Sequence, residues 1–393
     1  MTDLLSLIWN YGVPFAAILT VVVFVHEFGH YWVARRCGVR VETFSIGFGP
    51  ELFHRMDKHG TRWRVALFPI GGYVKFFGDA DPASMPDAKA GASMSADQRG
   101  QAFFAKPLGQ KSAIVAAGPV VNYIFAFVVL VGLFMAYGRP FTPPMVGGLV
   151  EGGAAQQAGL LKGDRILSVD GYAIERFEDI QRQILLANGQ PVRLRYAREG
   201  NETEITVTPI RSAAPAALAE PGKTDQKTPD EQAAAARPRL GVISPTLEFR
   251  KLGGMESISA AGQEVVELTW TTLRTLGQAI SGARDAKEVL GGPLRIAQMS
   301  GETARMGLAN VLWFVALLSL NLGLLNLFPI PLLDGGHLLF YACEKLRGRP
   351  LGERVQEAAA RIGLGTVLAL MLFATWNDIV QLRVFSFLKG LFS

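Results

Sequence analysis

The sequence predicts a polytopic α-helical membrane protein with four transmembrane helices. Among its 393 residues, 49% are hydrophobic and only 19% are charged, and the mean hydropathy is +0.24. The chain is therefore more apolar than an ordinary soluble protein. Four windows are long and apolar enough to cross roughly 30 Å of hydrocarbon as helices. They cover about residues 11–33, 114–137, 309–333 and 362–382.

Basic residues indicate how these helices are oriented. Lysine and arginine gather in 34–112 and in 341–361, and short loops rich in these residues stay in the cytoplasm. Both termini and the long region 138–308 are therefore expected outside, which in a bacterium is the periplasmic side. The first window lacks a basic flank and a small-residue cleavage site, so we expect it to stay in the mature protein. These features predict a multi-pass protein of the bacterial cytoplasmic membrane.

The remaining composition argues against two classes of protein. The two cysteines, Cys37 and Cys343, cannot build a disulfide framework. The formal net charge of +5 is not gathered into basic runs with interleaved aromatic residues, so the chain has no nucleic-acid footprint.

The first apolar window contains a metal-binding pattern. His26 and His30 are one helical turn apart, so both imidazoles project from one face and can hold a single ion. Glu27 lies between them and can activate a water on that ion. The alternative is that these are polar residues that satisfy one another inside a helix bundle. Unpaired, such groups would cost several kcal/mol at membrane depth, which favours the metal site.

Two histidines do not complete a catalytic zinc site, which usually has three protein ligands and an open position. Asp334 is the candidate third ligand, because it lies at the inner end of the third window, at the depth expected for His30. The alternative role for Asp334 is a helix cap.

Two prolines, Pro329 and Pro331, break the helix just before Asp334 and free backbone groups that must face protein or a polar cavity. Asn321 and Asn326 can satisfy such groups. They can equally hold substrate or a developing oxyanion, and the sequence favours neither role.

Segments outside the windows have their own signatures. Residues 61–78 contain two short β-rich runs joined by Pro69–Gly72, which predicts a hairpin. Residues 140–211 contain short β segments with turn pairs at Gly163-Asp164 and Asp170-Gly171. Residues 212–238 have too few large apolar side chains for a core and should form a linker. Apolar residues between Glu256 and Ala283 recur at near-helical spacing, which predicts an amphipathic helix that lies either on the membrane surface or against the inserted domain.

Several motifs resemble the site-2 protease family of intramembrane zinc metalloproteases, closest to its bacterial regulator of sigma-E protease branch. The motifs are H-E-F-G-H at 26–30, G-F-G-P at 47–50, F-P-I-G-G-Y-V-K at 68–75, G-P-V-V-N at 118–122, G-P at 292–293 and N-L-F-P-I-P-L-L-D-G-G-H at 326–337. Residues 154–171 further resemble the core of a PDZ domain. Enterobacterial relatives carry two tandem PDZ modules, whereas this chain has room for one.

Site assignments follow from this resemblance. It implies one zinc ion per chain on His26, His30 and Asp334, with Glu27 as the catalytic base. Asn326, and also Asn321, would contact substrate or stabilise the active site. The hairpin would dip into the membrane, where Gly71, Gly72 and Tyr73 would hold an unwound substrate beside an edge strand. An ordinary cytoplasmic hairpin is the alternative.

The resemblance also implies substrates and partners. These are single-span membrane proteins in the lipid bilayer, such as anti-sigma factors already shortened by a site-1 protease, and leftover signal peptides. Such cleavage belongs to regulated intramembrane proteolysis in stress responses. The PDZ domain would dock a trimmed chain end, act as a steric gate, or do both. A membrane-anchored PDZ scaffold with a structural metal site is the alternative, and ion transport ranks last because the second window carries no charged residue.

The full prediction is thus four transmembrane helices, a membrane-associated β-hairpin and one inserted extracytoplasmic PDZ domain of the α+β type. The expected segments are 1–111 (first helix and hairpin), 112–139 (second helix), 140–211 (PDZ), 212–238 (linker), 239–307 (juxtamembrane amphipathic region) and 308–393 (third and fourth helices).

Overall fold

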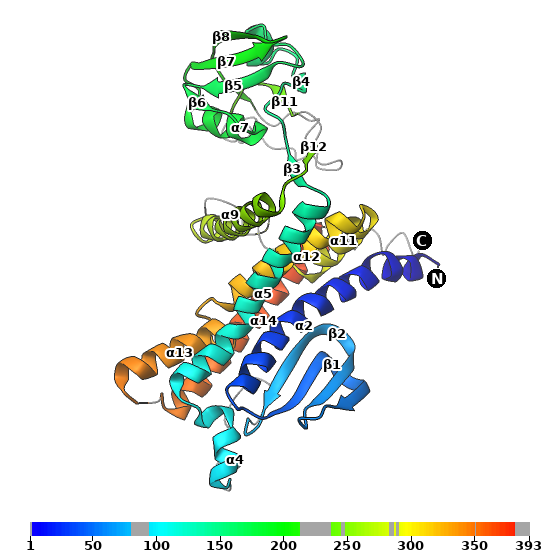
Figure 1. Cartoon of the computed structure of the whole chain (residues 1–393), viewed down its shortest axis with the longest axis vertical. Helices are drawn as coiled ribbons and strands as arrows, with labels where there is room; N and C mark the ends of the chain where they lie inside the picture. Colours follow the sequence, from blue (N-terminus) through cyan, green and yellow to red (C-terminus); the bar gives the residue numbers. More distant parts are fainter. Residues whose placement is uncertain are drawn as a thin grey trace. The chain divides into compact units, whose positions relative to one another are not determined.

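A computed structural model describes residues 2–79, 94–212, 237–244, 248–282, 287, 291–349 and 351–381. The chain divides into two compact units (Figure 1). Met1–Ala136 and Gly253–Ser393 form the first unit, and Tyr137–Leu252 forms the second.

The first unit contains the predicted membrane helices. Within the described residues, four candidate spans are long and apolar enough to cross a bilayer: Leu5–Arg36, Leu108–Ala136, Leu308–Asn326 and Arg354–Val380. They belong to α1 (Thr2–Leu7), η1 (Ile8–Gly12) and α2 (Val13–Arg36), which form one continuous run, and to α5 (Leu108–Ala136), α12 (Leu308–Asn326) and α14 (Glu353–Gln381). The expectation of four apolar membrane helices is confirmed.

The third predicted window was too long. It extended to residue 333, whereas α12 ends at Asn326 and a short loop follows. Pro329 and Pro331 lie in this loop, and proline can neither donate the intrahelical hydrogen bond nor fit beside the carbonyl of the preceding turn. A new helix, α13 (Asp334–Arg347), begins directly after the loop.

Helix α5 packs between α2 and α12 (Figure 1), and small residues bring the three backbones close. A Cβ atom on Gly29 of α2 would lie 2.6 Å from the Ala117 carbonyl oxygen, and one on Gly323 of α12 would lie 3.0 Å from that of Pro119. Close backbone approach through small residues is typical of helix association in membranes. It places the side chains of α2 directly on the surface of α5.

The β-hairpin is larger than predicted. Strand β1 (Val41–Met56) pairs antiparallel with β2 (Arg62–Phe76), and residues 57–61 form the turn. Pro69–Gly72, which we expected to join two paired runs, instead lies inside β2. Thr43–Ile46 of β1 is in register with both Arg62–Val65 and Gly72–Lys75. The two predicted runs therefore pair with opposite sides of the same β1 segment and not with each other.

One part of this hairpin packs on α2, and another part is exposed. Val41, Phe44, Val74 and Phe76 are buried in a cluster that includes Ala34 of α2. In contrast, Phe48, Leu52, Phe53 and Phe68 are each at least 44% exposed. Large exposed apolar side chains in such number are unusual for a soluble surface and suit contact with lipid.

Further helices belong to the first unit. They are α4 (Ala96–Gln101), η2 (Phe103–Ala105), α9 (Gly254–Ile280) and α11 (Pro293–Arg305). Helix α9 corresponds to the amphipathic helix expected from Glu256 to Ala283, and it packs on α5 and α12. Helix α11 contacts α2 and α14. Asp378 of α14 accepts hydrogen bonds of 2.9 Å from the backbone N–H groups of Gly292 and Arg295 and so fixes the start of α11.

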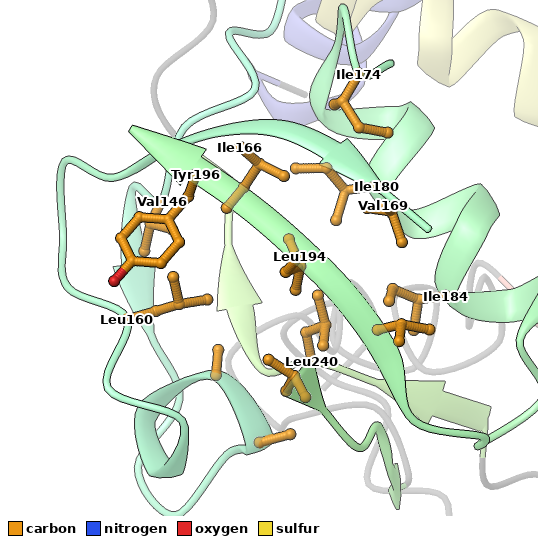
Figure 2. Packing of buried hydrophobic residues seen from close by; sticks show 14 of the residues in the cluster. Val146, Leu160, Ile166, Val169, Ile174, Ile180, Ile184, Leu194, Tyr196 and Leu240 are labelled. Atoms are coloured by element: carbon orange, nitrogen blue, oxygen red, sulfur yellow. The ribbon is translucent and has the colours of Figure 1, made fainter. Parts of the chain in front are cut away.

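The second unit has a four-stranded sheet in the order β6-β5-β7-β8. The strands are β5 (Arg165–Val169), β6 (Tyr172–Ala173), β7 (Val192–Arg198) and β8 (Asn201–Val207), with α6 (Ala154–Gln157) and α7 (Phe177–Leu186) beside them. Figure 2 shows Ile180 and Ile184 of α7 facing the sheet residues Val169 and Leu194. These strands and helices enclose one apolar core.

Strands at and after the end of the predicted linker return to this unit. β10 (Arg237–Arg239) pairs with β9 (Ile210–Ser212), β11 (Val242–Ile243) with β4 (Gly148–Leu149), and β12 (Glu248–Arg250) with β3 (Arg139–Phe141). The second compact unit extends to Leu252. Of the predicted linker 212–238, residues 213–236 lie outside the described residues.

Candidate metal centre

Helix α2 presents both predicted histidines to one point. His26 and His30 are 7% and 8% exposed, and their Nε2 atoms lie 3.2 Å apart. Spacing of four residues places the two rings on the same face of the helix. The facing surface of α5 leaves room for them because Gly118 has no side chain: a Cβ atom there would lie 2.8 Å from Cε1 of His26 and closer still to His30.

Asp334 reaches the same point from the other end of the sequence. It is the first residue of α13, and its Oδ2 atom lies 3.2 Å from His26 Nε2 and 3.5 Å from His30 Nε2. Gly335 and Gly336 make this position possible, because a Cβ atom on either would collide with backbone oxygens of the preceding loop. The ligand atoms of the three side chains all lie within 4.8 Å of one another. The predicted set His26, His30 and Asp334 therefore comes together.

The chemistry of these side chains suits a divalent metal. Two imidazoles and a carboxylate are the donors found in many catalytic zinc sites, where a fourth position stays open. Asp334 Oδ2 is buried, and no group in the described part of the chain is aligned to donate a hydrogen bond to it. A buried carboxylate oxygen is costly without such a partner, and a cation bound between the three side chains would satisfy it. The residues present thus fit a zinc ion.

The other nitrogen of each imidazole contacts α5. His30 Nδ1 lies 2.9 Å from the carbonyl oxygen of Ile114, and His26 Nδ1 lies 3.1 Å from Nδ2 of Asn122. Pro119 lies inside α5 between these contacts. A backbone carbonyl has two lone pairs, so that of Ile114 can accept from His30 as well as from its own helix.

A cavity of about 330 Å³ opens beside the three candidate ligands. Glu27 lines it, next to His26 and His30. The hairpin contributes Gly71, Gly72 and Tyr73, and the loop after α12 contributes Leu332. Among the described residues that line the cavity none is lysine or arginine, and the only acidic ones are Glu27 and Asp334. This charge distribution favours a bound cation.

The two predicted asparagines have different surroundings. Asn326 lines the cavity, and its Nδ2 atom lies 3.5 Å from His26 Nε2. Asn321 is not among the described residues that line the cavity, and its Oδ1 atom accepts a 3.0 Å hydrogen bond from Thr272 of α9. The contact with Thr272 links α9 to α12.

The sequence assigns no site role to Leu332 or Asn122. His337 and Leu332 line the cavity, and Leu332 has a positive φ of 92°, which is strained for a residue with a Cβ atom. Asn122 contacts His26 from α5. Its position at the end of G-P-V-V-N was noted as a motif, but the sequence does not show which side chain it faces.

Known proteins resemble this chain along most of its length. The model of peptidase family M50 matches residues 14–370. A protein of Rhizobium meliloti named "putative zinc metalloprotease" is 43% identical, over 94% of this chain and 96% of that protein. A protein of Agrobacterium fabrum with the same description is 41% identical, over 95% and 96%. Metalloprotease MmpA of Caulobacter vibrioides is 36% identical, over 96% and 97%.

Family, composition and structure agree. Four apolar helices mark an integral membrane protein, and the His-His-Asp group suits the metal that the relatives' names imply. The match to the family model covers far more than half of the chain. The chain belongs to peptidase family M50, the site-2 protease family, and is a zinc metalloprotease.

Proposed function

We propose that this protein hydrolyses peptide bonds within the transmembrane segments of single-span membrane proteins. The observation that carries the proposal is the position of His26, Glu27 and His30 inside the candidate span Leu5–Arg36. A reaction centre built on these residues would act at membrane depth. Bonds of soluble proteins or of exposed loops would not reach it.

Each proposed ligand has a defined atom. His26 and His30 would bind one zinc ion through Nε2, and Asp334 would bind it through Oδ2, which leaves one position open. Zinc in such a site acidifies its bound water and polarises the substrate carbonyl. Asp334 also balances charge, because a carboxylate next to two neutral imidazoles offsets half of the ion's double charge.

Glu27 is the proposed catalytic base. Its carboxylate lines the cavity beside both histidines and is the only acidic side chain there, among the described residues, that is not a proposed ligand. It would take the proton of the attacking water and then deliver it to the nitrogen of the leaving amine. Val74 of β2 lines the same cavity as Glu27.

The hairpin is the proposed substrate support. Gly72–Lys75 pairs with Thr43–Ile46 on one side, and no described strand pairs with its other side. Gly71, Gly72 and Tyr73 line the cavity next to Glu27. A helical substrate hides its carbonyls in backbone hydrogen bonds, so it must unwind before attack. An open strand edge would hold the unwound segment by strand addition, and Asn326 would contact its carbonyl oxygen.

The second unit is the proposed PDZ domain. Its core, formed by α6, α7 and a small antiparallel sheet, supports this assignment. On the extracytoplasmic side, it would gate access by size and dock the new end of a substrate already trimmed by a site-1 protease. Anti-sigma factors and signal-peptide remnants are the substrates we propose, with the protein in the bacterial cytoplasmic membrane and its active site open to the cytoplasm. The loops rich in lysine and arginine support this orientation.

The scaffold alternative is disfavoured. A structural zinc site normally has four protein ligands, whereas three candidate ligands gather here among the described residues. The family assignment as a zinc metalloprotease points the same way.

Co-expression with a tagged substrate tests the proposal. The substrate is a single-span anti-sigma-type protein that lacks its outer domain, and it is expressed with the wild type or with Glu27→Gln. A membrane-internal product with the wild type alone is expected. Equal product with Glu27→Gln, at equal protein levels, would contradict the assignment of Glu27. A product from neither, with several substrates and with zinc bound, would contradict the proposed activity.

A further inference from the structure

The two candidate zinc-binding imidazoles are held on α5 by different kinds of group. A neutral imidazole binds metal through the nitrogen that carries no proton, so its other nitrogen must be protonated. His30 meets this condition through the backbone, because its Nδ1 lies 2.9 Å from the carbonyl oxygen of Ile114, which can only accept. The Nε2 atom of His30 is therefore left with its lone pair toward Asp334.

The corresponding partner of His26 is a side chain. Its Nδ1 lies 3.1 Å from the Asn122 carboxamide. Asn122 is fully buried, and its Oδ1 atom has no hydrogen-bond partner among the described residues. The oxygen and the nitrogen of a carboxamide are nearly the same in shape, so a half-turn of the amide exchanges them. With the oxygen toward His26, the carboxamide accepts a proton from Nδ1 and leaves Nε2 free to bind metal.

We propose that Asn122 is the positioning residue of His26: its carboxamide oxygen accepts a hydrogen bond from Nδ1 and so selects the tautomer that binds zinc through Nε2. The inference rests on the proposed metal centre and adds a residue to it. Groups that hold the second nitrogen of a metal-binding histidine commonly change metal affinity by roughly 10- to 100-fold when they are removed.

The surroundings of Asn122 suit this role. Its backbone carbonyl accepts a 3.0 Å hydrogen bond from the hydroxyl of Ser319 in α12, so α12 holds the same turn of α5 that faces α2. Gly118, one helical turn earlier, lets both rings lie against α5. Asn122 of α5 is thus buried where α5 meets α2 and α12. The remaining choice for its carboxamide is which of its two atoms, oxygen or nitrogen, faces His26.

Zinc affinity of the full-length protein in detergent tests the role, measured by competition with a chromophoric chelator and without any substrate. Asn122→Leu removes both the donor and the acceptor at similar size. We expect it to bind zinc roughly 10- to 100-fold more weakly than the wild type. Asn122→Asp keeps only acceptors, and we expect its affinity to stay within a few-fold of the wild type. Cobalt affinity, measured from the absorption spectrum of the bound ion, should change in the same order among the variants.

Two control variants separate the possible failures. Gly132→Ala changes α5 at a position with no atom near its added Cβ, and it should leave zinc affinity unchanged. His26→Ala should abolish tight binding, and unchanged affinity there would refute the metal centre itself. Unchanged affinity in Asn122→Leu would overturn only the role of Asn122.

Weak zinc binding by Asn122→Asp with a normal circular dichroism spectrum would overturn the proposed direction of the hydrogen bond, because it would show that the amide of Asn122 donates to His26. If Asn122→Leu fails to fold, Asn122→Asp decides alone.

Discussion

Gly118 of α5 packs directly on the imidazole of His30, without space for a methyl group between them. The same glycine lies beside the ring of His26, where an added Cβ atom would be 2.8 Å from Cε1. The backbone of α5 is therefore one wall of the candidate metal centre, and the two rings cannot tilt toward it. This contact explains why the first residue of the G-P-V-V-N motif is glycine: a larger side chain would collide with the imidazoles.

Alanine at position 118 should therefore weaken metal binding. In Gly118→Ala the new methyl group must displace His30, or push α2 away from α5, and overpacking of this kind costs roughly 1–3 kcal/mol. Zinc affinity should fall about 10- to 100-fold, as measured by chelator competition. Gly132→Ala is the matched control, because it lies on the same helix with no atom near its added Cβ. Equal affinity in both variants would show that the rings can move freely.

Alanine at position 363 should disturb the candidate site from the opposite side. Gly363 of α14 packs against the carbonyl of Pro331, and a Cβ atom there would overlap the carbonyl oxygen. Because Pro331 precedes Asp334 by only three residues, Gly363→Ala should displace the carboxylate and reduce both zinc content and proteolysis at least tenfold. Gly365→Ala has open space around its added Cβ and should behave like the wild type. Normal zinc content in Gly363→Ala would mean that the loop adjusts without moving Asp334.

The second unit should lose stability in acid because of one ion pair. Asp164 accepts two 2.7 Å hydrogen bonds from Arg198 and one of 2.8 Å from the Leu161 backbone. Burial alone would raise the pKa of Asp164, but these hydrogen bonds outweigh it and hold the pKa below its usual value. The stabilisation is therefore present above the unfolded pKa of about 4 and is lost as the pH falls through the folded value.

Hydrogen exchange measures this effect on peptides from β5 and β7 of the intact protein, after correction for intrinsic rates. Wild type should be better protected than Asp164→Asn at pH 7, and the difference should shrink below about pH 4. Glu202→Gln is the control, because it removes a more exposed ion pair with Arg195. It should change the protection of these peptides little at any pH. A difference between wild type and Asp164→Asn that does not change with pH would contradict the account.

Local patterns made much of the site predictable. The helical spacing of His26 and His30 predicts that their rings share one face, and the depth expected for the end of the third window predicted that Asp334 would lie near them. The sequence could not indicate Asn122, because its contact with His26 joins residues that are far apart in the chain and depends on how α2 and α5 rotate against each other. The conformation of Leu332 could not be predicted for a different reason. Its positive φ is one that leucine does not favour, so the residue type gives no signal for it.

Non-local strand pairing explains the remaining errors in the fold. Gly47 and Gly49 both have positive φ, yet they lie inside the long strand β1. Strands β10, β11 and β12 follow a segment whose composition predicts a linker, and their partners lie before it. Short strands of this kind gain their stability from pairing partners, so their own residues give a weak signal.

Cleavage by the purified protein in liposomes tests the central claim most directly. A single-span substrate is incorporated with the wild type or with Glu27→Gln, and the scissile bond is mapped by mass spectrometry. We predict a bond inside the membrane segment, loss of cleavage after chelation, recovery with zinc, and no product from Glu27→Gln. Cleavage only at bonds outside the membrane segment, or undiminished cleavage by Glu27→Gln, would contradict the account.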